Sequence, residues 1–356
     1  MQTIPRGPED VTPAWLGSVL DADVETVDVT PIGTGQTGAT YRVSAVYSAQ
    51  QSELPATFAI KLPAQDDAVR ERVALGYRSE VEFYTDVAES VAIGVPRCFH
   101  SDISDDGTDF VLLLADMSPA VQGDQIAGCS EQEARLAVEA LAGLHGPSWC
   151  DPAWLELSSI SMPKPGDEAA AKGLGDVSLM AAGIVIERLG TRISGQDQET
   201  LTAAMGSVTP WLAAEPNRYA LMHGDYRLDN MLFTPDRTRV TVVDWQTMGV
   251  GLAGRDLAFF TATSLDPEMR PQVEERLVAA YHRALLGYGV VDYDVDTCWH
   301  DYRLGVVQAP LITALGLAFA SSTERGDEMI LTMLSRGCRA VRELGTLDLI
   351  SSYQSI

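Results

Sequence analysis

The sequence has few basic residues. Only 25 of its 356 residues are Lys or Arg, against 50 that are Asp or Glu, so the formal net charge at pH 7 is -25 and the isoelectric point lies near 4.4. Such a chain repels phosphate backbones and anionic lipid surfaces. We therefore expect neither nucleic acid nor a membrane among its partners. The charge favours a cationic substrate only weakly, because acidic surfaces often serve solubility alone.

Cysteine is also scarce, and its distribution excludes two kinds of site. The five cysteines are Cys98, Cys129, Cys150, Cys298 and Cys338. They are far apart and odd in number, and they form neither a C-x-x-C pair nor a Cys/His cluster with zinc-ligand spacing. The first 20 residues also lack the basic segment and long apolar segment of a secretory signal. We expect reduced thiols and a cytoplasmic location.

Long apolar runs are nearly absent as well. Residues 304–323 carry no charge over a length that could span a bilayer. Polar residues such as Gln308 and Thr313 dilute this stretch, and no flank rich in Lys or Arg marks an inside face. The sequence therefore favours a buried core helix here.

The N-terminal third predicts strands around one helix. Alternating apolar residues at 25–62 predict three antiparallel strands. Apolar residues at helical spacing predict an amphipathic helix over 68–90. Two more strands, joined by a hairpin around the turn signal SDDGTD, are predicted between 95 and 117. Together these elements make a small α+β unit that ends near residue 115.

The rest of the chain is predicted to be mainly helical. Ser130 followed by Glu133 has the spacing of a capping box, and helical patterns dominate from there to the C-terminus. A chain of 356 residues that is 46% hydrophobic usually divides into more than one unit. We expect an α+β fold with an N-terminal nucleotide-binding domain at 1–115 and a C-terminal catalytic and substrate-binding helical domain at 116–356.

The strongest functional pattern is H-G-D-x-x-x-x-N at residues 223–230, followed by Asp244 in the predicted strand TVVDW. Phosphoryl transfer needs a carboxylate that orients the attacking hydroxyl and accepts its proton, and oxygen ligands that hold Mg²⁺. Asp225 can supply the first, and Asn230 and Asp244 the second. A single Asp or Asn near a turn more often only bonds the backbone. The joint spacing favours the catalytic interpretation.

This pattern resembles the aminoglycoside phosphotransferase and choline kinase family, which has a two-lobed protein-kinase-like fold. In that fold a small lobe holds an antiparallel sheet and one helix, and a larger lobe is mainly helical. The resemblance implies that Asp225 is the catalytic aspartate, that Asn230 and Asp244 are magnesium ligands and that His223 braces the catalytic loop. Arg227 stands where protein kinases place a phosphate-contacting lysine, and it joins the catalytic set.

The resemblance also implies a nucleotide site in the N-terminal lobe. Lys61, at the end of the predicted strand FAIKL, stands where kinases keep the lysine that neutralises the α- and β-phosphates. Its partner should be a glutamate of the next helix. Glu80 fits the family pattern E-x-x-F-Y, and Glu82 is the alternative. Because exposed helices are rich in glutamate, the pattern leaves this choice open.

A glycine-rich turn precedes Lys61 in the sequence. Gly33, Gly35, Thr37 and Gly38 belong to the turn GTGQTG, whose backbone N–H groups can approach phosphates closely because glycine has no side chain. A simple tight turn is the alternative. The kinase order of turn, lysine and catalytic loop favours a phosphate-binding role.

Two further residues match motifs of the same family. Asp256 lies in a G-x-x-x-D-L-A-like segment, whose aspartate steadies the catalytic loop in family members. His145 lies in an L-H-x-x-x-W segment, and we expect it to be structural, since a histidine at a helix end mostly packs and hydrogen-bonds.

We therefore expect transfer of the γ-phosphate of ATP, with Mg²⁺, to a hydroxyl of a small molecule. The strings D-W-Q and E-x-x-F-Y resemble the ecdysteroid-kinase-like branch, which is associated with sterol-like or other hydrophobic alcohols. An aminoglycoside-type antibiotic phosphotransferase is one alternative, and it would need convergent carboxylates in the helical lobe. A nucleotide-binding pseudokinase with a regulatory or scaffold role is the other, although every chemically required residue is present. The sequence names neither the acceptor nor the oligomeric state.

Overall fold

The computed structural model describes residues 3–32, 38–48, 54–319 and 323–353. The chain divides into two compact units. The first, here the sheet unit, comprises Met1–Glu89, Val95–Ala120 and Val243–Thr247, and the second, here the helical unit, comprises Ser90–Gly94, Val121–Val242 and Met248–Ile356. Residues 243–247, which the predicted boundary at 115 assigns to the C-terminal domain, thus pack with the sheet unit.

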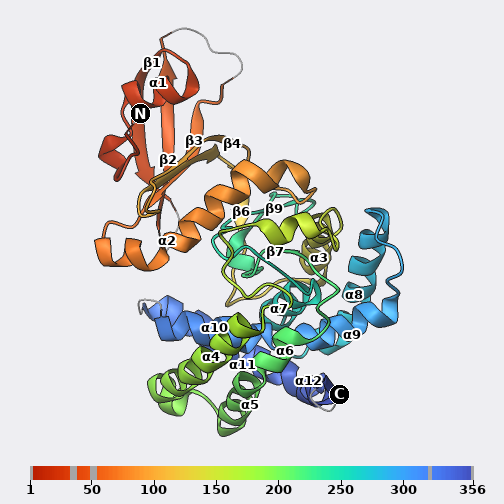
Figure 1. Ribbon diagram of the computed structural model, residues 1–356. Helices are drawn as coiled ribbons and strands as arrows, with labels where there is room; N and C mark the ends of the chain where they lie inside the picture. Colours follow the sequence, from red (N-terminus) through yellow and green to blue (C-terminus); the bar gives the residue numbers. More distant parts are fainter. Residues whose placement is uncertain (1–2, 33–37, 49–53, 320–322, 354–356) are drawn as a thin grey trace. The chain divides into compact units, whose positions relative to one another are not determined.

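The sheet unit is built on a five-stranded antiparallel sheet with the strand order β1-β2-β3-β5-β4 (Figure 1). The strands are β1 (Val24–Pro31), β2 (Gly38–Tyr47), β3 (Thr57–Pro63), β4 (Cys98–Ile103) and β5 (Phe110–Ala115). In β3, Phe58, Ile60 and Leu62 are fully buried on one face, and the alternation of a strand turns Lys61 to the opposite face. Lys61 pairs in register with Leu112 of β5.

One helix packs on each face of this sheet. On the face of Phe58, α1 (Pro13–Leu20) contributes Trp15 and Leu16 to a shared apolar core. On the other face, α2 (Asp67–Glu82) stacks Tyr77 on Phe110 of β5 with ring centroids 4.1 Å apart. Because both faces of β5 are covered, its apolar run is continuous rather than alternating.

The two helices of the sheet unit begin with identifiable caps. Thr12 accepts a hydrogen bond from the backbone N–H of Trp15, and proline follows at the first helical position of α1. The sequence pattern predicts no helix there, although this start signal is present. Asp66 caps α2, which continues into a π-helical turn at Phe83–Val87 (η2) and a 3₁₀ turn at Ala88–Ser90 (η3). The helix predicted over 68–90 is therefore present, with a changed pitch after Glu82.

The helical unit contains most of the chain. Its helices are α3 (Glu131–His145), α4 (Glu168–Leu189), α5 (Gly195–Gly206), α6 (Val208–Ala213), α7 (Gly254–Ser264), α8 (Arg270–Gly287), α9 (Val295–Gly305), α10 (Gln308–Phe319), α11 (Glu324–Glu343) and α12 (Thr346–Tyr353). Its short strands are β6 (Val121–Gln122), β7 (Ala220–Met222), β8 (Met231–Phe233), β9 (Val240–Val242) and β10 (Gly249–Gly251). They form a three-stranded sheet of order β6-β8-β9 and a pair β10-β7. The predicted capping box starts α3, since Ser130 and Glu133 bond each other's backbone N–H groups.

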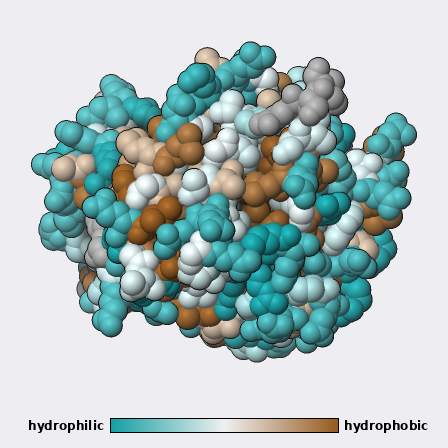
Figure 2. All heavy atoms as spheres, turned by 90° about the horizontal axis from the view of Figure 1, so that it is seen from below, coloured by the Kyte–Doolittle hydropathy of each residue, from teal (hydrophilic) through white to brown (hydrophobic). Residues whose placement is uncertain are grey.

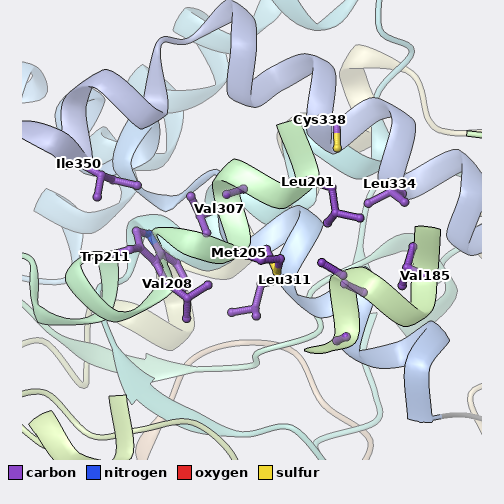
Figure 3. Packing of buried hydrophobic residues seen from close by; sticks show 14 of the residues in the cluster. Val185, Leu201, Met205, Val208, Trp211, Val307, Leu311, Leu334, Cys338 and Ile350 are labelled. Atoms are coloured by element: carbon purple, nitrogen blue, oxygen red, sulfur yellow. The ribbon is translucent and has the colours of Figure 1, made fainter. Parts of the chain in front are cut away.

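The main core of the helical unit lies among α4, α5, α6, α10 and α11, as Figure 3 shows. Trp211 of α6 is fully buried there and donates its indole N–H to the carbonyl of Leu304 at 2.8 Å. Val208, Met205 and Leu311 surround it with apolar side chains. This core fixes α10, whose first residue contacts the catalytic loop.

Two segments are long and apolar enough to cross a membrane by length and composition. They are Glu168–Arg192, of mean hydropathy 1.5 with 33% of its most apolar window buried, and Val295–Phe319, of mean hydropathy 1.3 with 67% buried. The second contains most of the stretch 304–323, which the sequence predicts to be one buried core helix. In the structure this stretch is divided between the end of α9 and α10. The sequence prediction missed the first segment, which contains α4. Core helices pass the same test, and Figure 2 shows only separate hydrophobic patches among hydrophilic residues on the face it presents.

Candidate active site

Lys61 and Glu80 form a buried ion pair inside the sheet unit. The ammonium Nζ of Lys61 lies 2.6 Å from each carboxylate oxygen of Glu80 on α2. Glu80 is fully buried, and the Lys61 side chain is only 15% exposed. Of the two glutamates that the sequence allowed, the structure brings Glu80 to the lysine.

Burial is the largest influence on the pKa of both members of the pair. It raises the pKa of the Glu80 carboxyl above its ordinary value, against the opposing effect of Lys61. Burial lowers the pKa of Lys61, but the attraction of Asp244 and Glu80 outweighs it, so the net pKa of Lys61 is raised. The lysine therefore stays protonated at neutral pH. As the pH falls, it is the carboxylate of Glu80 that takes up a proton.

Asp244 lies beside the same lysine. Its Oδ1 is 3.5 Å from Lys61 Nζ, and its side chain is 37% exposed. Its backbone has φ of 69°, in the left-handed region that residues other than glycine rarely adopt. The carboxylate is thus held next to the Lys61–Glu80 pair while it keeps access to solvent.

The residues after Asp244 are anchored on α2. Trp245 is fully buried and stacks on Phe83 with centroids 3.6 Å apart and an interplanar angle of 4°. Its backbone carbonyl accepts a hydrogen bond from Ser79 at 3.1 Å, and its N–H donates to Glu80 at 3.3 Å. The Asp-Trp-Gln segment is therefore held against α2 and the turn that follows it by a ring stack and two hydrogen bonds.

The loop at 223–230, which the sequence predicts to be catalytic, belongs to the helical unit. It follows β7 and ends in the 3₁₀ turn Leu228–Asn230 (η6). Asn230 turns its amide back onto Asp225. Its Nδ2 donates to the backbone carbonyl of Asp225 at 2.9 Å and to carboxylate oxygen Oδ2 at 3.0 Å. The Asp225 side chain is 20% exposed, so the loop presents this carboxylate at the surface of the unit.

Arg227 is bound directly to Asp225. Its Nε donates to Oδ1 and Oδ2 of that carboxylate at 3.0 and 2.9 Å. Its Nη1 lies 3.1 Å from Asp229 and 3.2 Å from the sulfur of Met329 on α11. Arg325 of α11 also donates to Asp229, at 3.2 Å. The two carboxylates of the loop are therefore each paired with arginine.

A buried carboxylate on α7 holds the backbone at the start of this loop. Asp256 of α7 is fully buried and accepts the backbone N–H groups of His223 at 2.6 Å and Gly224 at 3.0 Å. His145 Nε2 lies 3.5 Å from Asp256 Oδ2, and its Nδ1 lies 2.7 Å from the hydroxyl of Tyr281. Asp256 thus occupies the loop-steadying position that its motif predicts, and His145 packs behind it.

Sequence reasoning missed two glutamines that hold the loop. Gln308 of α10 is fully buried and donates to the carbonyl of Gly224 at 3.1 Å. Gln125 is fully buried as well, and it accepts the N–H of Leu228 at 2.8 Å while donating to the carbonyl of Thr263 at 2.9 Å. The sequence marks Gln308 as unusual, because it is a polar residue within the uncharged stretch 304–323. No sequence feature marks Gln125.

Most of the glycine-rich turn lies outside the described residues. Gly33, Gly35 and Thr37 lie outside the described residues, and Gly38 begins β2, where it pairs in register with Pro63. The phosphate-binding role of the turn stays a prediction.

Within the described part of the chain, no three His, Cys, Asp or Glu side chains gather into a metal cluster. Magnesium does not require one, because it is commonly bound through one or two protein oxygens together with phosphates and water. Asp244 of the sheet unit and Asn230 of the helical unit offer oxygens of this kind. The residue types therefore fit a nucleotide-bound Mg²⁺ rather than a protein-enclosed metal.

A family model confirms the resemblance seen in the catalytic loop. The model of the phosphotransferase enzyme family, APH, matches residues 28–293. This chain belongs to that family, which supports a kinase-type phosphotransferase of small molecules. The match spans Lys61, Glu80, Asp225 and Asp244.

Solved structures of two kinases share the fold. Choline kinase from Cryptosporidium parvum Iowa II is 12% identical with a TM-score of 0.59, over 96% of each chain. Plasmodium vivax ethanolamine kinase is 13% identical with a TM-score of 0.55, over 90% of this chain and 85% of that one. At such identities the likeness concerns the fold alone, and it confirms the two-lobed α+β kinase-like class. The resemblance to the ecdysteroid-kinase-like branch is not confirmed and stays a prediction.

A curated relative matches part of the chain. Acyl-CoA dehydrogenase family member 11 of Gallus gallus is 28% identical over 176 residues, which are 47% of this chain and 20% of that protein. The chain therefore spans about a fifth of that relative's length. The activity of the whole relative does not follow for this chain.

Proposed function

We propose that the protein is an ATP- and Mg²⁺-dependent phosphotransferase that moves the γ-phosphate to a hydroxyl of a small molecule. The observation that carries the proposal is the Lys61–Glu80 pair, with Asp244 3.5 Å from the ammonium. An ion pair in this position is costly to bury and adds little to stability by itself. A lysine fixed in this way presents its positive charge to the oxygens of a bound phosphate group.

In the sheet unit, Lys61 would bind the α- and β-phosphates while Glu80 holds its ammonium in place. The turn with Gly33, Gly35, Thr37 and Gly38 would give backbone N–H groups to the phosphates. Bound Mg²⁺ would neutralise charge that develops on the phosphates, and Asp244 and Asn230 are its proposed protein ligands.

In the helical unit, Asp225 would orient the acceptor hydroxyl and take its proton. The hydroxyl oxygen forms a bond to the γ-phosphorus, the bond from that phosphorus to the β–γ bridging oxygen breaks, and ADP leaves. The Nδ2 group of Asn230 at 3.0 Å would fix the direction of the accepting carboxylate. Arg227 binds the same carboxylate, and its positive charge would meet the transferred phosphoryl group.

The acceptor is the open part of the proposal. Choline kinase and ethanolamine kinase are named for amino alcohols, so these are the first acceptors to test. The loop carboxylates Asp225 and Asp229 are both paired with Arg227. They give no support to a strongly cationic aminoglycoside over a neutral alcohol. A hydrophobic alcohol stays in the test set for that reason.

The test is ADP release in the presence of Mg-ATP and a panel of amino alcohols, sterols, other hydrophobic alcohols and aminoglycosides. At least one acceptor should raise ADP release, and the product should carry a phosphate ester. Asp225→Asn should lower turnover about 100- to 10,000-fold while nucleotide affinity is kept. A protein that neither binds ATP nor releases ADP with any acceptor would overturn the proposal. Turnover that survives Asp225→Asn would overturn the assigned base.

A further inference from the structure

Gln246, the third residue of the Asp-Trp-Gln segment, donates a hydrogen bond to Glu80. Its Nε2 lies 3.2 Å from Glu80 Oε2. We propose that Gln246 is a positioning residue that holds the Glu80 carboxylate, and through it Lys61, in the orientation that binds nucleotide phosphates. This inference rests on the proposed function of Lys61.

The need for such a residue follows from the burial of Glu80. A carboxylate away from water is stabilised only when its lone pairs are used. Lys61 bonds both oxygens at 2.6 Å. The N–H of Trp245 adds a bond to Oε1, and the amide of Gln246 adds one to Oε2. Each oxygen of Glu80 therefore accepts one hydrogen bond from the lysine and one from the Asp-Trp-Gln segment.

The two kinds of donor differ in what they fix. The lysine ammonium sits on a flexible four-carbon stem and bonds in many directions. The donors of Trp245 and Gln246 come from one anchored segment, so they set the rotation of the carboxylate plane. If the amide of Gln246 is lost, Glu80 can still attract Lys61, but the position of the ammonium is no longer set.

Packing around Gln246 keeps its amide in place. Trp245 is held by its stack on Phe83 and by the hydrogen bond from Ser79. On α2, Gly76 faces Gln246, and a Cβ at Gly76 would lie 3.2 Å from Gln246 Cβ. Such contact is tighter than ordinary packing, so a small residue at this point of α2 lets the segment approach. The glutamate, lysine and glutamine are consequently assembled by packing within the unit.

A purely structural role for Gln246 can be separated from a positioning role by charge. Gln246→Glu keeps the size of the side chain but replaces the donor with a carboxylate that faces Glu80. The two carboxylates then repel each other, which moves Glu80 and with it the Lys61 ammonium, so the affinity for phosphate groups falls. A packing role predicts an equal loss of affinity for adenosine, which has no phosphate.

The experiment measures the Kd of Mg-ATP and the Kd of adenosine by titration calorimetry for the intact protein and its variants. Gln246→Glu should weaken Mg-ATP binding about tenfold and leave the Kd of adenosine unchanged. Gln246→Met, which has similar length and no donor, should weaken Mg-ATP binding with the same selectivity. Gln65→Glu is the matched control, because Gln65 bonds only backbone carbonyls of Arg6 and Pro63 in the same unit. It should leave the Kd unchanged.

Unchanged affinity of both Gln246 variants, with intact nucleotide binding by the natural protein, would overturn the positioning role. An equal loss of affinity for adenosine in Gln246→Glu would also overturn it, since it would indicate disturbed packing. Circular dichroism melts identify a variant that does not fold, and Gln246→Met then decides. A natural protein that binds no Mg-ATP would overturn the proposed function instead.

Discussion

The two units hold their functional carboxylates in different ways. In the sheet unit, Glu80 and Asp244 meet Lys61 through side-chain charges that come from three separate segments. In the helical unit, the loop that carries Asp225 is fixed mainly through its backbone, which Asp256 bonds at two N–H groups. In the first arrangement charged side chains meet one another, and in the second a buried carboxylate holds the backbone of the loop. Substitutions in the two units should therefore fail in different measurements.

The largest effect is expected where the backbone support is removed. Asp256→Ala leaves the buried N–H groups of His223 and Gly224 without their acceptor, which should cost about 3 kcal/mol of unfolding free energy. Displacement of Asp225 should lower turnover at least about 100-fold. Thermal or urea unfolding and steady-state kinetics measure the two losses. Nucleotide affinity should change little, and a variant that loses affinity but keeps turnover would contradict the contrast.

A smaller effect is expected where a charge is removed from the sheet unit. Glu80→Gln keeps the volume of the side chain but replaces one acceptor oxygen with a donor that faces the Lys61 ammonium. The Kd of Mg-ATP should rise about tenfold, since hydrogen bonds to charged groups contribute roughly 1.5 to 3 kcal/mol. Glu82→Gln, on the same helix, is the control and should bind as the natural protein does. Equal affinities of the two variants would reassign the partner of Lys61.

The smallest effect is expected from pH alone. Because burial raises the pKa of Glu80 above 4.5, this carboxyl begins to take up a proton while the pH is still above that value. Lys61, whose pKa is raised above 10.5, keeps its charge on the alkaline side. Mg-ATP affinity should therefore fall roughly threefold as the pH falls towards the raised pKa of Glu80, and it should stay level towards about pH 9. Glu80→Gln should lack the acid-side loss, and an alkaline loss in the natural protein would contradict the assignment.

The sequence predicted the parts of the site whose chemistry is carried by motifs. Asp225 and Asn230 stand at the H-G-D-x-x-x-x-N spacing, and Lys61 and Glu80 are assigned through the family resemblance, with Glu82 as the alternative partner. The strands around Lys61 follow from alternating apolar residues. The resemblance behind these assignments is confirmed at the level of the family and the fold. Their roles in binding and catalysis stay proposals.

The sequence could not predict the residues that act through distant neighbours. Gln125, Gln308 and Gln246 are glutamines whose partners lie between 84 and 166 positions away in the sequence. No sequence pattern predicts which glutamine forms a buried hydrogen bond, because its partner is brought close only by the folding of the chain. The same limit explains why residues 243–247 were expected in the C-terminal domain although they pack with the sheet unit.

The stack of Trp245 on Phe83 bears on how an enzyme with this site is regulated. Because it ties the Asp-Trp-Gln segment to the π-helical turn that continues α2, packing within the sheet unit holds Asp244 and Glu80 beside Lys61. Activation by rotation of this helix, or by a covalent mark that reorders the segment, would have to break a buried aromatic contact first.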